Sequence, residues 1–306
     1  MRMLIVGAGS TGGYFGGRLA EAGRDVTFLV RPARAERLRA AGLQIISPHG
    51  DVTLQPHVLT ASEIVAPFDV VLLTVKAFSL DAAMADLAPA VGPATMIVPV
   101  LNGMRHMDAL AARFGREAVV GGVCKVATSL DGQGRIVQLS RLQELAYGEL
   151  DGEPSARTGE LDALMQGAGF DAKLSHTIER EMWEKWVLLA TLGGVTCLMR
   201  GAIGEVEAAE GAEFARQFLN ECVATATAAG HAPGEAFVAS ATATVTAKSS
   251  PLTSSMYRDL RAGLPIEADQ IIGDLLVRAR GLSVSAPLLA AALVHLKVYQ
   301  NRVSGV

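Results

Sequence analysis

Residues 3–12 read Met-Leu-Ile-Val-Gly-Ala-Gly-Ser-Thr-Gly, a short apolar run that ends at a glycine-rich loop. Such an apolar run is typical of a buried strand. A helical pattern follows as far as Ala22 and is closed by Gly23, and residues 26–30 form a second apolar run. Strand, helix and strand within about 30 residues make a βαβ unit with a right-handed crossover. The chain is therefore expected to begin as an α/β fold with a parallel sheet.

The loop between the first strand and the helix fits the pattern G-x-G-x-x-G. In this pattern the first glycine, Gly7, makes the tight turn, Gly9 lets the backbone approach a pyrophosphate, and Gly12 permits close helix–strand packing. The N–H groups at the start of the helix then bind the phosphates. The alternative is a loop whose glycines serve packing only, but the position of the motif inside a βαβ unit favours a dinucleotide site. The residues expected to bind the cofactor here are Gly7, Ala8, Gly9, Ser10, Thr11 and Gly12.

The end of the second strand indicates which dinucleotide binds. An acidic residue there holds the ribose 2′-hydroxyl of NAD, whereas an arginine accommodates the 2′-phosphate of NADP. The sequence has Arg31 at this point, and the first acidic residue, Glu36, comes later. A guanidinium can bind a phosphate through two hydrogen bonds and stack on the adenine, so Arg31 favours NADP(H). The alternative is a solvated basic helix start, since Arg34, Arg37 and Arg39 follow.

The rest of the chain divides into two halves of different character. Apolar runs at residues 70–75 and 96–101 show no alternation, which indicates a parallel sheet covered on both faces. From Ser175 onward only helical patterns appear. We therefore expect an NADP-binding Rossmann domain over residues 1–174 and an all-helical domain for substrate binding and dimerisation over residues 175–306. Further elements expected in the first half are a hairpin over 43–54, strands at 119–123, 136–139 and 144–147, a hairpin turn at 131–134 and a surface loop over 148–159.

Composition excludes several classes of partner. The 306 residues are 50% hydrophobic and carry a net charge of −4, which argues against binding to nucleic acid or anionic lipid. The longest uncharged apolar stretch, residues 186–199, is shorter than the about 20 residues that span a membrane. The three cysteines are scattered and the six histidines lack metal-ligand spacing, so we expect no disulfide framework and no metal. No export signal is visible, which favours the cytoplasm.

Several motifs in a fixed order carry a resemblance to a known family. They are Val75-Lys76-Ala77, Leu101-Asn102-Gly103-Met104, Trp183-Glu184-Lys185-Trp186, and Ser254-Ser255-Met256-Tyr257-Arg258-Asp259-Leu260 followed by Glu267. This order resembles the ketopantoate reductase (2-dehydropantoate 2-reductase) family over nearly the whole chain. The resemblance implies a Rossmann domain and an all-helical domain with the active site in the cleft. It also implies reduction of 2-dehydropantoate to pantoate by NADPH, a step of pantothenate biosynthesis.

The resemblance implies two catalytic residues, Lys185 and Glu267. Lys185 matches the family's general acid, which protonates the developing alkoxide. An ammonium suits this role because it both stabilises an oxyanion and delivers a proton. Glu267 matches a carboxylate at the cofactor ribose and the lysine, and Asn102 matches a residue that bridges cofactor and substrate. The remaining matches are Lys76 near the nicotinamide ribose, Thr128 against the nicotinamide, and Ser255 at the substrate carboxylate.

Each of these residues also has a structural interpretation. The lysines at 76 and 185 could be solvated surface residues, with Lys185 paired to Glu181 on its own helix. Asn102 could belong to an ordinary turn, Ser255 could cap a helix, and Glu267 could be an exposed acid at a helix start. The motifs occur together in family order across two domains, which favours the functional interpretation.

The sequence departs from the family in the expected substrate site. Leu189, Gly193, Ile203 and Leu252 stand where the family has asparagines. Leu189 and Gly193 share one helical face with the lysine. On that face only Thr196 remains polar, and we expect it to contact the substrate. A site with few hydrogen-bond partners cannot discriminate strongly in favour of a substrate hydroxyl.

These departures leave several functions open. The chain is expected to reduce either 2-dehydropantoate or a less polar 2-oxo acid, with a small 2-oxo acid as its partner and a homodimer as a possible assembly. A non-catalytic NADP-binding sensor of the same fold is an alternative. An NAD-dependent hydroxy-acid dehydrogenase is a further alternative, against which Arg31 speaks.

Overall fold

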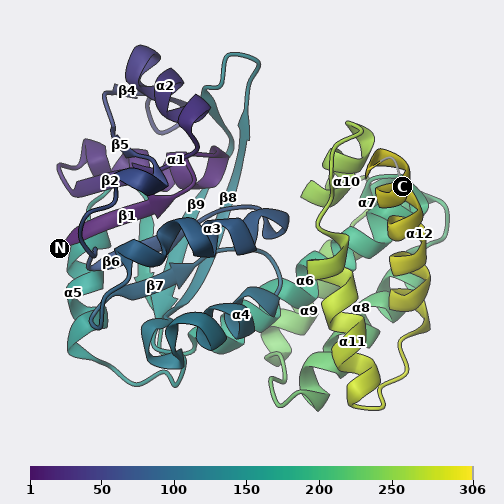
Figure 1. Ribbon diagram of the computed structural model, residues 1–306. Coiled ribbons are helices and arrows are strands. Elements are labelled where there is room, and N and C mark those ends of the chain that lie inside the picture. The colour runs from purple at the N-terminus through teal and green to yellow at the C-terminus, as the bar shows by residue number, and fades with distance from the viewer. Residues whose placement is uncertain (305–306) are drawn as a thin grey trace. The chain divides into compact units, whose positions relative to one another are not determined.

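The computed structural model describes residues 1–304 and separates the chain into two compact units (Figure 1). The first unit contains Met1–Leu101 and His106–Glu179, and the second contains Asn102–Arg105 and the chain from Arg180 onward. The expected order, an α/β domain followed by a helical domain, is confirmed. The roles assigned to residues 1–174 and 175–306 stay predictions.

The first unit is built on a parallel sheet whose strand order reverses at β1. The order is β5-β2-β1-β6-β7, and all four pairings are parallel. Open sheets of this kind bind ligands at the carboxyl ends of their strands, where the order reverses. The carboxyl end of β1 is therefore the expected ligand site of this sheet. Its strands are β1 (Arg2–Val6), β2 (Asp25–Leu29), β5 (His57–Leu59), β6 (Val70–Leu73) and β7 (Met96–Pro99).

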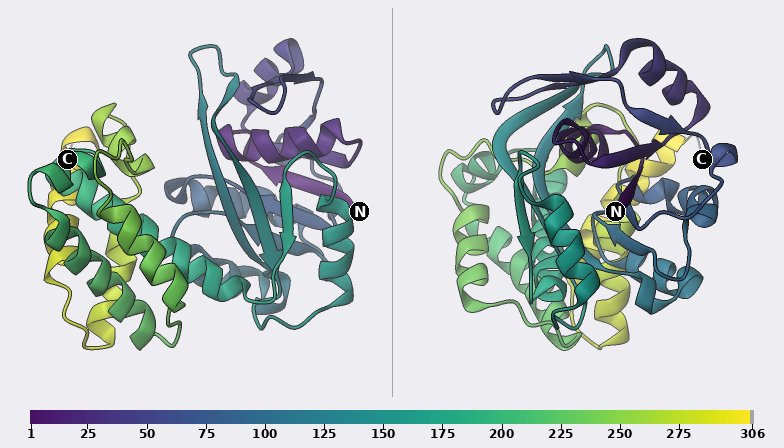
Figure 2. Two further views of the ribbon diagram at one scale, coloured as in Figure 1. Left: turned by 180° about the vertical axis from the view of Figure 1, so that it is seen from behind. Right: turned by 90° about the vertical axis from the view of Figure 1, so that its left-hand side faces the viewer.

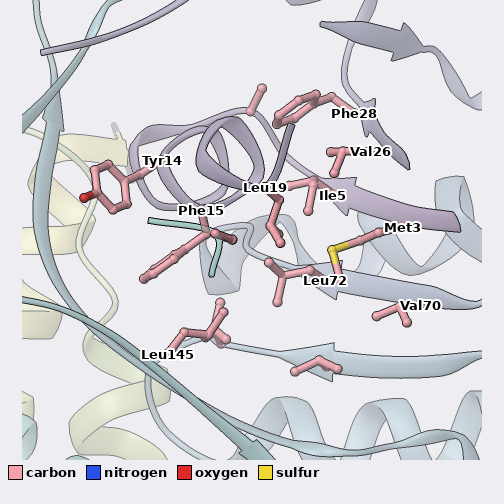
Figure 3. Packing of buried hydrophobic residues seen from close by; sticks show 14 of the residues in the cluster. Met3, Ile5, Tyr14, Phe15, Leu19, Val26, Phe28, Val70, Leu72 and Leu145 are labelled. Carbon is pink, nitrogen blue, oxygen red and sulfur yellow. The ribbon is translucent and has the colours of Figure 1, made fainter. Parts of the chain in front are cut away.

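Helix α1 (Ser10–Glu21) packs closely on this sheet (Figure 3). Phe15 and Leu19 from the helix are fully buried together with Ile5 and Phe28 from the strands. A Cβ at Gly16 would lie 2.7 Å from Phe28 Cε1 and 2.8 Å from Ile5 Cγ1. The glycines within this helix are thus required for close packing, and they bring the helix start to the end of β1.

A second sheet contains the expected hairpin and a long ribbon. β3 and β4 pair antiparallel within residues 43–54, so the hairpin is confirmed. β8 and β9 form the ribbon (Figure 2), whose register shifts between Val126 and Thr128. The two short strands expected at 136–139 and 144–147 are parts of one strand, β9, because residues 140–143 continue the extended backbone although Ser140 and Arg141 interrupt the apolar pattern. The strands are β3 (Leu43–Ile46), β4 (Val52–Leu54), β8 (Gly121–Leu130), β9 (Ile136–Gly148) and β10 (Asp171–Leu174).

The loop expected over residues 148–159 is shorter in the structure. The Ser155 hydroxyl accepts a hydrogen bond from the Thr158 backbone N–H at 3.2 Å and so starts α5 inside that range. The other helices before Ser175 are α2 (Pro32–Ala41), α3 (Leu80–Leu87), α4 (Arg105–Phe114) and α5 (Ala156–Met165), with short 3₁₀ turns η1 (Ala61–Glu63), η2 (Ala77–Ser79), η3 (Ala88–Ala90) and η4 (Arg116–Ala118).

The chain after β10 is helical as far as it is described. The long uncharged stretch at residues 186–199 lies in α6 (Ile178–Met199), and most of its residues are buried. A Cβ at Gly194 would lie 1.9 Å from Phe218 Cζ, so α6 and α8 are in direct contact there. None of the described helices is both long and apolar enough to cross a membrane. The helices are α6 (Ile178–Met199), α7 (Ile203–Ala208), α8 (Ala212–Ala228), α9 (Glu235–Val245), α10 (Ser255–Arg261), the π-helical turn η5 (Asp269–Gly273), α11 (Asp274–Gly281) and α12 (Pro287–Ser304).

Candidate functional site

The glycine loop follows β1 and has a backbone that only glycine allows at two positions. Gly7 has a φ of +97°, a conformation that side chains rarely adopt. A Cβ at Gly12 would lie 2.1 Å from the Gly7 carbonyl oxygen and 2.1 Å from Thr74 Oγ1. A Cβ at Gly9, in contrast, would meet nothing within 4 Å. The loop is therefore tight against the sheet at Gly7 and Gly12 and open at Gly9.

Thr74, which follows β6, holds this loop in place. Its hydroxyl lies 2.9 Å from the Val6 carbonyl oxygen and 3.0 Å from that of Gly7, close enough to donate to either. We did not single out this residue from the sequence. The available signal was one hydroxyl side chain at the end of an otherwise apolar strand run.

The start of α1 fits a phosphate group. Gly9 is the N-cap residue and provides no side chain to accept hydrogen bonds from the first N–H groups of the helix. The positive end of the helix dipole adds to the attraction for an anion. Together with the open space at Gly9, these features fit the pyrophosphate of a dinucleotide.

Two arginines near this loop have different environments. Arg31 is exposed and precedes α2 as its N-cap residue. Arg34 is partly buried: its Nε donates to the Ala8 carbonyl oxygen at 3.3 Å, and one Nη donates to that of Gly134 at 3.3 Å. Burial and the nearby Arg37 lower the pKa of the Arg34 guanidinium. Arg34 therefore connects the glycine loop to the β8–β9 turn, and its grouping with solvated arginines is wrong.

Lys76 and Thr128 also belong to the first unit. Lys76 is exposed and lies between β6 and η2, close to the carboxyl end of a parallel strand. Thr128 lies on β8 directly after the shift in register, where it pairs with Gln138. Irregular pairing of this kind occurs often near functional sites because it redirects side chains. The cofactor contacts of Lys76 and Thr128 stay predictions.

In the second unit the structure brings two of the expected site residues together. Asn102 Nδ2 donates to Glu267 Oε2 at 3.4 Å, although the residues are 165 positions apart. Glu267 is only 5% exposed, so its interpretation as an exposed helix-start acid is wrong. Gly103 has a φ of +82°, and a Cβ there would lie 2.4 Å from the Gln270 carbonyl oxygen. The Asn-Gly turn is thus packed directly against the segment that carries Glu267.

A π-helical turn follows Glu267 and is held by a tryptophan. The Trp186 indole Nε1 donates to the Ile271 carbonyl oxygen at 2.9 Å, and Trp186 is 1% exposed. A π-turn interrupts the regular helical hydrogen bonds and occurs often at functional sites. Because Trp186 is the neighbour of Lys185, this bond fixes the lysine's helix to the Glu267 segment.

Replacing Trp186 with phenylalanine is expected to lower the free energy of unfolding by about 1–3 kcal/mol, because the buried Ile271 carbonyl loses its partner. Urea unfolding measures the change. Trp183→Phe is the control, since Trp183 is equally buried and packs on His231 at a ring distance of 4.7 Å. An equal decrease in the free energy of unfolding of both variants would show that the smaller ring, and not the lost hydrogen bond, causes the destabilisation.

The hydroxyl groups near α10 serve the helix packing. Thr196 is fully buried, and its hydroxyl lies 2.6 Å from the Leu192 carbonyl oxygen and 2.8 Å from Ser254 Oγ. Ser254 caps α10, accepting from the Tyr257 N–H at 2.9 Å. The cap is therefore Ser254, and the cap interpretation of Ser255 is wrong. Ser255 is partly buried and begins the helix. The substrate contact expected of Thr196 stays a prediction.

Two family models cover most of the chain. The description "Ketopantoate reductase PanE/ApbA" matches residues 3–152, and "Ketopantoate reductase PanE/ApbA C terminal" matches residues 177–300. The chain belongs to the ketopantoate reductase family. Members of this family are pyridine-nucleotide-dependent oxidoreductases that act on a keto or CH–OH group, so this chain is an enzyme of that type.

Individual relatives agree with this assignment over their full length. The uncharacterized oxidoreductase YkpB of Bacillus subtilis (strain 168) is 37% identical over 301 residues, which covers 98% of this chain and 99% of the relative. A 2-dehydropantoate 2-reductase of Mesorhizobium japonicum is 28% identical and covers 96% of both chains. The crystal structure of 2-dehydropantoate 2-reductase from Methylococcus capsulatus is 28% identical with a TM-score of 0.88, and covers 99% of this chain and 98% of that chain.

At the four positions where the family resemblance leads us to expect asparagines, this chain has apolar residues in varied environments. Ile203 is fully buried, and Leu252 is 36% exposed. Leu189 is partly buried on α6, on the same face as Lys185. At Gly193 an added Cβ would lie 2.6 Å from Met256 Cε. The amides expected from the family are thus replaced by apolar groups or by bare backbone.

Two of the three cysteines are buried. Burial raises the pKa of Cys197 and of Cys222 to about 12, so neither is a thiolate near neutral pH. Among residues 1–304, no group of three or more histidine, cysteine or acidic side chains is arranged to hold a metal ion.

Proposed function

We propose that this chain reduces a 2-oxo acid to a 2-hydroxy acid with NADPH, and that 2-dehydropantoate, the substrate of the family's pantothenate branch, is the first candidate. The observation that supports this most is the hydrogen bond between Asn102 and Glu267. It joins two of the motifs that the family resemblance assigns to one site. A packing-only role for these motifs would not require a buried carboxylate beside an amide.

The proposed chemistry assigns one task to each residue. NADPH, when bound, supplies the hydride that reduces the keto carbon. The Lys185 ammonium stabilises the developing alkoxide and transfers its proton to that oxygen, which completes the alcohol. The Asn102 amide and the Glu267 carboxylate orient the reactants, and the Ser255 hydroxyl binds the substrate carboxylate.

The preference for NADPH over NADH rests on the arginines beside the glycine loop. We expect Arg31→Ala to raise the Kd for NADPH by about 10–10²-fold, because a hydrogen bond to a charged group contributes about 1.5–3 kcal/mol. The Kd for NADH should change little. Nucleotide fluorescence titration measures both constants. Arg39→Ala, which removes an exposed α2 arginine paired with Glu63 at 3.2 Å, is the matched control. Equal weakening of both nucleotides would contradict the proposed phosphate contact.

A panel of 2-oxo acids, assayed with NADPH and with NADH, tests the function itself. Oxidation of NADPH by 2-dehydropantoate or another 2-oxo acid supports a reductase. Binding of NADPH without oxidation by any 2-oxo acid supports the non-catalytic sensor instead. A less polar substrate is the second candidate, and the replacement of family amides by Leu189 and Gly193 favours it. The cytoplasmic location and the homodimer stay predictions.

A further inference from the structure

The face of α6 beyond Lys185 is apolar. Residues four positions apart in a helix lie on the same face, so Leu189 and then Gly193 follow Lys185 along one face of α6. Leu189 is partly buried, and Gly193 is buried and has no side chain. A substrate whose keto group is near the Lys185 ammonium therefore places the rest of its carbon chain along an apolar surface.

A methionine from α10 closes this surface. Met256 is 3% exposed, and its Cε would lie 2.6 Å from a Cβ at position 193. The thioether methyl thus lies directly against the bare backbone of α6. Methionine is flexible and polarizable and adapts to the shape of an apolar ligand. Because Met256 follows Ser255, the proposed carboxylate contact and this apolar group are neighbours.

Three hydroxyl groups on α6 and at the start of α10 are already engaged within the protein. Thr196 and Ser254 bond to each other at 2.8 Å, and Ser254 also caps α10. The Tyr257 hydroxyl donates to the Arg200 carbonyl oxygen. A hydroxyl on the substrate would thus exchange its hydrogen bonds to water for contacts with Leu189 and Met256, which is unfavourable.

We propose that the site selects a 2-oxo acid with a branched aliphatic side chain that carries no hydroxyl, and that Leu189, Gly193 and Met256 determine this choice. The inference rests on the proposed function and, of its two candidate substrates, selects the less polar one over 2-dehydropantoate. An apolar site discriminates only moderately against an added hydroxyl, by about 10²-fold at most. The expected preference is therefore between about tenfold and that limit.

Two substrates with the same carbon skeleton test the proposal. They are 2-dehydropantoate and 3,3-dimethyl-2-oxobutanoate, which differ only in the hydroxyl. We expect kcat/KM with NADPH to be at least about tenfold higher for 3,3-dimethyl-2-oxobutanoate. If 2-dehydropantoate is preferred or equal, the inference is wrong while the proposed reductase function stands. If neither this pair nor any other 2-oxo acid is reduced, although NADPH binds, both the inference and the proposed function are wrong.

Variants identify the residues responsible. Met256→Gln keeps the length of the side chain and adds an amide, and Gly193→Asn adds an amide to the helix face itself. Both should shift the ratio of the two kcat/KM values at least about tenfold toward 2-dehydropantoate, since a hydroxyl gains a partner. Gly193→Ala adds a Cβ that would lie 2.6 Å from Met256 Cε but no amide, so it should not shift the ratio toward 2-dehydropantoate. Val277→Asn, at a residue that is 65% exposed on α11, controls for a polar change elsewhere.

The variants also separate selectivity from damage to the fold. Met256→Gln and Gly193→Asn affect different helices, so a folding defect in one leaves the other informative. Thermal unfolding and NADPH titration establish that each variant is folded. An unchanged ratio in a folded, active Met256→Gln enzyme would overturn the role of Met256, and an equal shift in Gly193→Ala would assign the effect to volume.

Discussion

Replacing Lys185 with alanine is expected to lower kcat by about 10²–10⁴-fold while NADPH binding stays nearly intact. The alkoxide that develops as hydride arrives would lose both its cationic partner and its proton source. The glycine loop belongs to the first unit and Lys185 to the second, so removal of the lysine is expected to leave the glycine loop unchanged. Steady-state kinetics and NADPH fluorescence titration measure the two effects separately.

A chemical rescue distinguishes proton donation from a structural role. A small primary amine added to Lys185→Ala should restore part of the lost turnover, because it can deliver the proton from solution. Lys248→Ala, which removes an exposed lysine after α9, is the control and should behave like the unaltered enzyme. Equal loss of turnover and of NADPH binding in Lys185→Ala, without rescue, would make this lysine a structural residue.

Replacing Gly12 with alanine is expected to damage both the fold and the nucleotide site. The new Cβ would lie 2.1 Å from the Gly7 carbonyl oxygen and 2.1 Å from Thr74 Oγ1. The carbonyl belongs to the loop itself and cannot move away without displacing α1 from β1. Overpacking of this kind costs about 1–3 kcal/mol, and we expect a Kd for NADPH at least about tenfold higher.

Gly9→Ala is the matched variant in the same loop. Its Cβ would meet nothing within 4 Å, so the free energy of unfolding should stay the same. NADPH binding should still weaken, because the methyl group would occupy the space through which the pyrophosphate approaches the backbone. Urea unfolding and nucleotide titration of both variants test this contrast. Gly9→Ala with unchanged nucleotide binding would show that the phosphates lie elsewhere.

The fold of the first unit followed from local patterns. Apolar runs without alternation predicted β1, β6 and β7, because strands in a parallel sheet are covered on both faces. The ribbon was harder to predict, since Ser140 and Arg141 interrupt the apolar pattern of β9 and the leucines on either side of them, Leu139 and Leu142, are exposed. Backbone pairing with β8 holds this ribbon, and such pairing leaves little trace in composition.

The side-chain contacts of the candidate site, unlike the strands of the first unit, could not be predicted from local sequence patterns. The motif order pointed to Asn102 and Glu267 individually, but their contact spans 165 positions and depends on how α6, η5 and the Asn-Gly turn pack. Arg34 appeared to be one of several solvated arginines until the β8–β9 turn placed Gly134 against it. Ser254, and not Ser255, proved to be the cap, because the Ser254 hydroxyl accepts from the Tyr257 N–H while Ser255 is the first residue of the helix.

The amino-acid sequence alone therefore specified the βαβ unit, the glycine loop, the family and the apolar character of the helix that carries Lys185. These features depend on hydrophobic periodicity and on backbone conformations that only glycine adopts, and both are properties of short segments. Only the tertiary structure showed that Thr196 is engaged in packing and that Met256 covers Gly193. Contacts of this kind form between helices distant in sequence, and close packing of their side chains decides them.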